Sequence, residues 1–190
     1  MMAALLLSLV LFMKPRLLLL CLITLLTATA PAQARTYLVE LVIFARDAGL
    51  GAEHWRPDPG FPAVGNAIEL GPVGSGRFNQ LAGSRMELNH IAATLERRGG
   101  YRVLQHIGWV QPGLSANKAI KVRIDNGGQL TGTIKVSLAH YLHLNADLLY
   151  TAGPEGPSVR MKQSRRMRSR EVHYLDSPVL GIIVLMTPAG

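Results

Sequence analysis

The sequence has 190 residues, of which 48% are apolar and 17% are charged, and its formal net charge is +8. This composition excludes an intrinsically disordered chain, because such chains combine low hydrophobicity with high charge. The single cysteine, Cys21, excludes a scaffold held together by disulfides.

The first 34 residues have the pattern of a secretory signal peptide. A short basic segment, Lys14-Pro15-Arg16, precedes the apolar residues 17–26, and Ala32-Gln33-Ala34 forms a small-residue cleavage site. The apolar segment is shorter than the ~20 residues that span a bilayer. We therefore expect cleavage after Ala34, with a retained membrane anchor as the alternative. Residues 1–12 precede the basic segment and are interpreted as a mis-assigned start.

Removal of residues 1–34 leaves 156 residues, residues 35–190, with no cysteine and a net charge of +6. A chain of this length can form one domain with a core of its own. The sequence thus predicts a single periplasmic domain without a stable membrane span after cleavage. Its positive charge favours an anionic partner, such as cell-wall polymer, lipid head groups or an acidic protein. Nucleic acid is not expected as a partner outside the cytoplasm.

The first half of the predicted domain contains a strand, a loop and a helix. Residues 37–45 are rich in β-branched and aromatic residues and nearly all apolar, which predicts a central strand covered on both faces. Residues 46–77 are rich in glycine and proline and predict a long irregular loop, with a short helix near residues 53–55. A capping box formed by Ser84 and Glu87 predicts a helix from Arg85 to Arg98 with one apolar face.

The second half predicts mainly strands, which are separated by turns. Apolar or alternating patterns mark strands over residues 101–109, 119–125, 129–138, 141–151, 159–170 and 179–186. The expected fold is α+β, with a mostly antiparallel sheet of about six strands and one main helix, Arg85 to Arg98, packed on one face.

The strongest charge feature is a basic run that begins at Arg160 and ends at Arg170. In an extended strand Arg166, Arg168 and Arg170 share one face, and a row of guanidinium groups can bind carboxylates bidentately. The alternative is an exposed edge strand whose cationic side chains prevent edge-to-edge pairing. Charge alone does not separate these two interpretations.

No motif in the sequence predicts catalysis. A metal site built from His106, His143 and His173 has no ligand spacing to support it, so a metal-dependent hydrolase remains a minor alternative. We expect no enzymatic activity, no metal and no cofactor. Asp176 is expected to cap a turn, and His173 to hold the last strand in register.

Four segments together resemble one known family. They are residues 37–46 (YLVELVIFAR), 101–112 (YRVLQHIGWVQP), 141–144 (YLHL) and 164–178 (SRRMRSREVHYLDSP), the last continuing into an apolar stretch up to Pro188. These segments resemble the CsiV family of periplasmic peptidoglycan-binding proteins of Gram-negative bacteria. Ser177 departs from the pattern, because a histidine is expected there.

The resemblance implies a non-enzymatic protein that binds peptidoglycan and assists cell-wall synthesis. It also implies a lipoprotein activator of a penicillin-binding protein as a partner. The alternative is a periplasmic adaptor that docks an acidic protein without binding the wall. The candidate ligand-binding residues are cationic, aromatic or hydrogen-bonding side chains: Arg165, Arg166, Arg168, Arg170, His173, Tyr174, Asp176 and Trp109.

Overall fold

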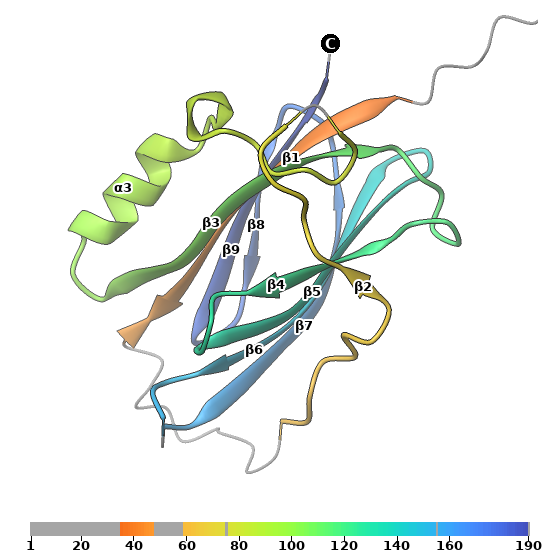
Figure 1. The fold of residues 1–190 in the computed structure, drawn as a ribbon. Helices are drawn as coiled ribbons and strands as arrows, with labels where there is room; N and C mark the ends of the chain where they lie inside the picture. Colours follow the sequence, from red (N-terminus) through yellow and green to blue (C-terminus); the bar gives the residue numbers. More distant parts are fainter. Residues whose placement is uncertain (1–34, 48–58, 75, 155, 190) are drawn as a thin grey trace, which may run out of the picture. The chain divides into compact units, whose positions relative to one another are not determined.

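Nine β-strands and one α-helix form the part of the chain that the computed structural model describes, residues 35–47, 59–74, 76–154 and 156–189 (Figure 1). The expected signal peptide and the short helix expected near residues 53–55 lie outside this part. The elements are β1 (Thr36–Arg46), β2 (Ala67–Ile68), α3 (Asn89–Arg97), β3 (Tyr101–Pro112), β4 (Lys121–Asp125), β5 (Leu130–Leu138), β6 (Leu142–Thr151), β7 (Ser158–Met167), β8 (Val172–Asp176) and β9 (Leu180–Pro188).

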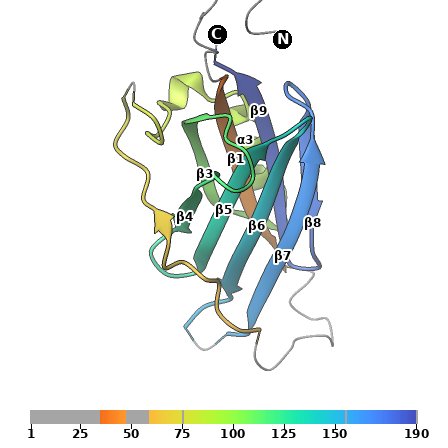
Figure 2. The ribbon, with the colours of Figure 1, turned by 90° about the vertical axis from the view of Figure 1, so that its right-hand side faces the viewer.

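The strands form two sheets that lie face to face. One sheet has the order β3-β1-β9-β8 and is antiparallel throughout. The other has the order β2-β4-β5-β6-β7, in which only the short β2 pairs in parallel with its neighbour. Figure 2 shows the five-stranded sheet in front of the four-stranded sheet, with α3 behind both.

The core fills the space between the two sheets. Val39, Leu41 and Ile43 alternate along the inner face of β1 and are completely buried. They pack in the same cluster as Ile134 of β5 and Leu144 of β6, which are also completely buried. Complete burial of one such side chain stabilises the fold by roughly 1.5–3 kcal/mol. The prediction that β1 is a central strand covered on both faces is therefore confirmed.

Helix α3 covers the outer face of the four-stranded sheet. Val42 of β1 and Leu185 of β9 lie on this face and pack against Leu88 and Ala92, while Ile91 and Leu95 flank them. The spacing of the apolar residues in the helix places them on one side, as the sequence predicted. The helix thus buries the outer face of β1 and supports the sheet from behind.

The predicted start of this helix is wrong. The α-helix begins at Asn89, and Ser84 instead belongs to a short 3-10 helix, Gly83–Arg85. No side chain of the helix itself caps its N-terminus. The carboxylate of Glu40, on β1, accepts hydrogen bonds from the backbone N–H groups of Glu87 and Leu88 at 2.7 and 2.9 Å. A partner 47 residues earlier in the chain therefore replaces the capping box.

The strand prediction is confirmed in class but is wrong in number and arrangement. The described part of the chain is largely antiparallel and carries one α-helix, yet it has nine strands in two sheets where about six in one sheet were expected. Two strands were missed: β2, which lies in the predicted irregular loop, and β8, which follows the basic run. The strand predicted to reach Arg170 ends at Met167, and Arg170 has a positive φ of 64°.

Candidate functional site

Strand β7 ends within the basic run, so the arginines do not form the row on one strand face that the sequence predicted. Arg165 and Arg166 are adjacent in the strand and therefore point to opposite faces of the sheet. Arg168 and Arg170 lie in the turn to β8, where the backbone N–H of Arg170 donates to the carbonyl of Met186 at 2.8 Å. Because the chain turns here, Arg166, Arg168 and Arg170 do not share one strand face.

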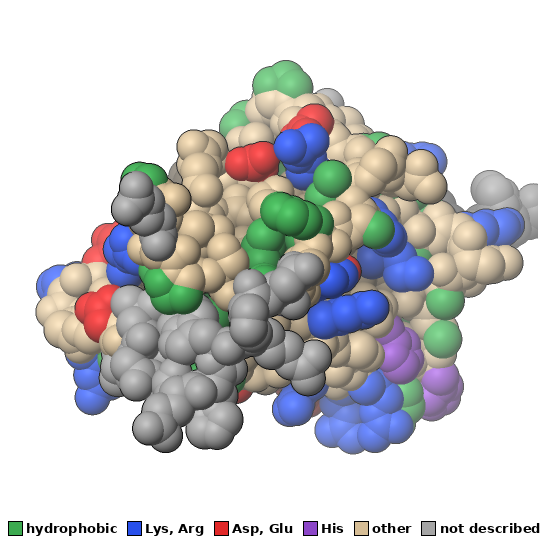
Figure 3. Space-filling model, turned by 90° about the horizontal axis from the view of Figure 1, so that it is seen from below, with side chains coloured by type: hydrophobic (Ala, Val, Ile, Leu, Met, Phe, Trp, Pro, Cys, Tyr) green, Lys and Arg blue, Asp and Glu red, His purple; other side chains and the backbone are tan. Residues whose placement is uncertain are grey.

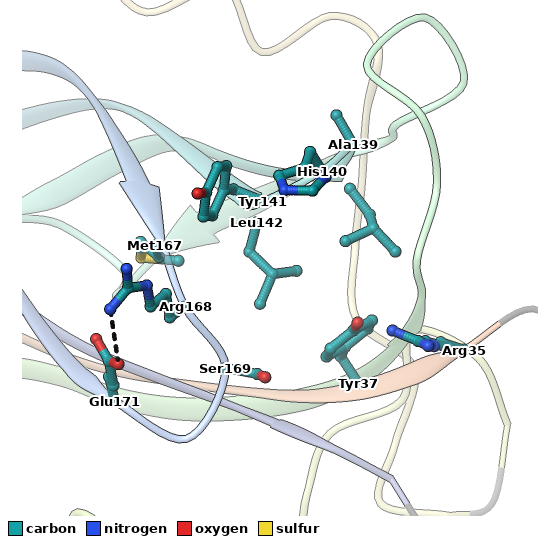
Figure 4. A pocket seen from close by; sticks show the side chains of 11 residues that line it. Arg35, Tyr37, Ala139, His140, Tyr141, Leu142, Met167, Arg168, Ser169 and Glu171 are labelled. Atoms are coloured by element: carbon teal, nitrogen blue, oxygen red, sulfur yellow. Dashed lines mark ion pairs between the residues drawn. The ribbon is translucent and has the colours of Figure 1, made fainter.

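The same turn forms one wall of a cleft at the end of the sandwich (Figure 4). The cleft has a volume of about 570 Å³, and the other walls are the β5–β6 turn and the start of β1. This volume lies in the range of small-ligand sites, ~300–1,000 Å³. We call it the end cleft. Its lining residues are Arg35, Tyr37, Leu138, Ala139, His140, Tyr141, Leu142, Met167, Arg168, Ser169 and Glu171.

The end cleft has an apolar floor and a cationic rim. Tyr37, Leu142 and Met167 are buried and form the lower part of the cleft. Figure 4 shows Arg35 and Arg168 on different sides of the opening. The guanidinium of Arg168 lies 3.8 Å from the carboxylate of Glu171, and both side chains are more than half exposed. A surface pair of this kind is weak, so the Arg168 guanidinium can exchange this partner for a ligand carboxylate.

Aromatic rings link Arg166 to the end cleft. The guanidinium of Arg166 lies over the ring of Tyr141, 4.6 Å from its centre, a cation–π arrangement. The rings of His140 and Tyr141 meet edge to face at 4.9 Å. The half-buried Tyr141 therefore contributes a ring to the cleft wall and holds Arg166 beside it.

His173 supports the turn that carries Arg168. Its ring is largely buried, and the backbone N–H of Arg168 donates to Nε2 at 3.1 Å. The start of β1 is held in a similar way, because the backbone N–H of Gly113 donates to the carbonyl of Arg35 at 2.7 Å. Both cationic walls of the end cleft are thus fixed by hydrogen bonds to the backbone.

Tyr174 and Asp176 form a second group, at the other end of β8. Arg46, the last residue of β1, binds the carboxylate of Asp176 and the hydroxyl of Tyr174. The ring of Tyr174 stacks on that of Phe44 at 6.3 Å. These contacts tie β8 to β1 across β9. The structure does not bring Tyr174 and Asp176 together with the arginines of the end cleft.

Two sequence expectations near this region need correction. The turn between β8 and β9 is capped by Ser177, not by Asp176: the Leu180 N–H donates to Ser177 Oγ at 2.9 Å. Trp109 is completely buried in the core, and its Nε1 donates to Gln111 at 2.9 Å. Its ring is therefore not available to stack on a ligand in this structure.

The three histidines considered as metal ligands lie apart, on β3, β6 and β8. His106 is bonded to Glu40, at 2.7 Å, and His173 to the Arg168 backbone. In the described part of the chain, no group of three His, Cys, Asp or Glu side chains is arranged to hold a metal.

The basic run in the sequence pointed to Arg168, which lines the end cleft, and to Arg166, which contacts the cleft residue Tyr141. Most of the other cleft residues were not predicted from the sequence. Arg35, Tyr37 and His140 come from two further segments and carry no motif of their own. Residues 141–144 were predicted as part of a strand and noted in the family resemblance, but they were not proposed as ligand-binding residues. The arrangement combines exposed guanidinium groups with aromatic and aliphatic surfaces, so it can bind an amphipathic ligand that bears a carboxylate.

Comparison with known proteins identifies the family. The residues that the structure describes include no helix long and apolar enough to cross a bilayer. No curated protein and no solved structure matches the chain. Residues 16–189, nearly the whole chain, match the family described as "Peptidoglycan-binding protein, CsiV". The chain therefore belongs to the CsiV family of peptidoglycan-binding proteins.

Proposed function

We propose that this protein is a periplasmic, non-enzymatic peptidoglycan-binding protein that assists cell-wall synthesis, and that the end cleft is its binding site. The family membership supports binding to peptidoglycan. The observation that carries the choice of site is the presence of two exposed arginines, Arg35 and Arg168, on different sides of a cleft that the buried Tyr37, Leu142 and Met167 also line.

The chemistry of the end cleft suits peptidoglycan, which combines sugar rings with the carboxylates of its stem peptides. A guanidinium group binds a carboxylate through two parallel hydrogen bonds. Among the residues that the structure describes, the charged partner of Arg168 is the exposed Glu171. The rings of His140 and Tyr141 provide flat surfaces against which the apolar face of a sugar can pack. We therefore assign the carboxylate to the arginines and the sugar to the aromatic wall.

The proposed function also includes export to the periplasm and a protein partner. Removal of residues 1–34 after Ala34 delivers residues 35–190 to the periplasm, where peptidoglycan is located. A lipoprotein activator of a penicillin-binding protein is the proposed protein partner. In this role the protein recruits or positions synthesis machinery on the wall and breaks no bond itself.

The test is co-sedimentation with isolated sacculi, using the protein as the cell exports it. We expect saturable binding, which weakens as salt rises because exposed charges are screened. Arg35→Ala combined with Arg168→Ala should weaken binding at least about tenfold, the effect of ~1.4 kcal/mol. The control, Arg97→Ala combined with Arg98→Ala, removes the same charge from the exposed end of α3 and should bind like the wild type.

Two other outcomes contradict this function. If sacculi bind no more protein than a control protein of similar charge, while crosslinking in cells captures one acidic protein, the protein is an adaptor. If the purified protein releases soluble fragments from sacculi and this release disappears after chelation of metals, it is a hydrolase.

A further inference from the structure

A second concave site lies on the open face of the five-stranded sheet. This groove, which we call the lysine groove, has a volume of about 450 Å³ and crosses β4, β5, β6 and β7. Figure 3, a view of the molecule from below, shows Lys and Arg side chains close to histidines on part of the surface. The polar and charged side chains relevant here are Lys121, Thr133, Lys135, Asn145, Lys162 and Ser164.

Three lysines line the lysine groove together with a single carboxylate, that of Asp147, which lies opposite Lys162 across β6 and β7. Lys121 and Lys135 are direct neighbours across β4 and β5, an arrangement in which like charges repel and destabilise the pair. Lys162 reaches the groove from β7. The ammonium groups of Lys121 and Lys135 donate to the carbonyls of Ala63 and Ala116, at 3.3 and 3.5 Å. Among the described residues, none of the three lysines forms an ion pair.

The one carboxylate in the groove is already neutralised. Arg160 binds Asp147 bidentately, with Nε–Oδ1 and Nη2–Oδ2 distances of 2.7 and 2.9 Å. The hydrogen bonds from Arg160 hold the pKa of Asp147 below its ordinary value of 3.8. Asp147 is therefore charged at neutral pH, and it is the one carboxylate among the four cationic side chains that line the groove, Lys121, Lys135, Arg160 and Lys162. The lining thus keeps a net positive charge.

We propose that the lysine groove binds a phosphate-type anion, that is, a phosphate or diphosphate group. A lysine ammonium is a compact point charge without the planar fork that makes arginine selective for carboxylates, and it is a common phosphate ligand. Several cations from different strands can surround a group with acceptor oxygens on all sides. The Ser164 hydroxyl and the Asn145 amide are additional hydrogen-bond donors in the groove.

This site is distinct from the end cleft in both position and cation type. The end cleft lies between turns and presents arginines over an apolar floor, whereas the lysine groove lies on the sheet face. The proposal therefore goes beyond peptidoglycan binding. A protein with both sites holds wall polymer at its end and a phosphate group on its sheet.

The test is calorimetric titration of the exported protein with inorganic pyrophosphate. We expect saturable binding in the wild type. The triple variant Lys121→Gln, Lys135→Gln, Lys162→Gln should bind at least about tenfold more weakly. The matched control, Arg85→Gln with Arg97→Gln and Arg98→Gln, removes the same charge from exposed positions near and in α3, on the other sheet, and should bind normally.

Thermal unfolding checks that both triple variants fold, and sacculus binding separates the two proposals. The lysine variant should still bind sacculi, whereas the end-cleft variant should still bind pyrophosphate. The inference is overturned if pyrophosphate gives no saturable heat, if both triple variants weaken equally, or if the groove binds an acidic peptide and not pyrophosphate.

A second arm identifies the source of the phosphate. Vesicles of phosphatidylglycerol are sedimented with the protein in the presence and absence of pyrophosphate. Binding that pyrophosphate displaces and that the lysine variant loses indicates a lipid head group. Pyrophosphate binding without vesicle binding indicates a soluble phosphate compound. Vesicle binding that the two triple variants lose to the same extent is nonspecific attraction and contradicts the proposal.

Discussion

Glu40 Oε1 lies 2.7 Å from His106 Nε2 and 2.9 Å from the backbone nitrogen of Leu88, the residue that precedes α3. Glu40 is only 4% exposed, so its carboxylate depends on these partners to compensate for lost water. The same carboxylate accepts from the Glu87 and Leu88 N–H groups. The Glu40 side chain therefore connects β1 with β3, through His106, and with the segment that leads into α3.

We predict that Glu40→Gln destabilises the protein by about 1–3 kcal/mol, the cost of leaving buried donors without an acceptor. The new amide has one acceptor oxygen where the carboxylate has two. Urea unfolding at pH 7 measures this. The control is Glu96→Gln, an exposed position on the same helix, which should change stability by less than about 0.5 kcal/mol. Equal effects from the two changes would show that the buried network adds nothing.

The Asp147–Arg160 pair should make the free energy of unfolding depend on pH in the acidic range. The folded pKa of Asp147 is lowered by Arg160, so its contribution is present above the unfolded value of 3.8 and is lost as pH falls through the lower folded value. We predict that Asp147→Asn costs roughly 1 kcal/mol at pH 7. Urea unfolding at pH 7 and pH 2.5 compares the two proteins. A difference that stays constant between these pH values contradicts the prediction.

Gly181 should tolerate no larger side chain. A Cβ added there overlaps the ring of Phe44, which lies flat over this glycine and stacks on Tyr174. We expect Gly181→Ala to cost about 1–3 kcal/mol, as overpacking does, and to alter the near-ultraviolet circular dichroism of the tyrosines. Gly128→Ala is the control, because a Cβ at Gly128 meets no other atom within 4 Å. Similar melting temperatures for both variants would rule out the overlap.

The ring of Tyr141, not its hydroxyl, should carry the sugar contact in the end cleft. We predict that Tyr141→Ala weakens sacculus binding roughly fivefold to tenfold, because the wall loses its ring and Arg166 loses its support. Tyr141→Phe keeps the ring and should bind within about twofold of the wild type. The measurement is co-sedimentation over a range of sacculus concentrations. Strong loss in the phenylalanine variant would assign the contact to the hydroxyl.

Apolar and alternating patterns within short segments of the sequence correctly predicted several strands. The continuous apolarity of residues 37–45 and the alternation of Val122 and Ile124 correspond to β1 and β4. Strand β8 was missed because the turn before it depends on a positive φ at Arg170, which a non-glycine residue does not reveal. The start of α3 was misplaced because its capping group, Glu40, is far away in the chain.

The candidate site was harder to predict than the fold, because its parts meet only after folding. Arg168 was identified from the charge of its own segment, but Arg35 and His140 reach the end cleft from segments with no pattern of their own. Trp109 was selected for its ring, yet its place in β3 points it into the core. Side-chain type indicated the chemistry, while strand register decided which groups reach solvent.

The hydrogen bond from Gly113 to the Arg35 carbonyl fixes the first described residue at the mouth of the end cleft. If the leader is cut after Ala34, as proposed, Arg35 becomes the new terminus and gains an α-ammonium group at that mouth. Cleavage would then complete the end cleft by adding a second positive charge, the α-ammonium group, to Arg35. The uncut precursor would lack that charge, so we expect it to bind the wall more weakly than the processed protein.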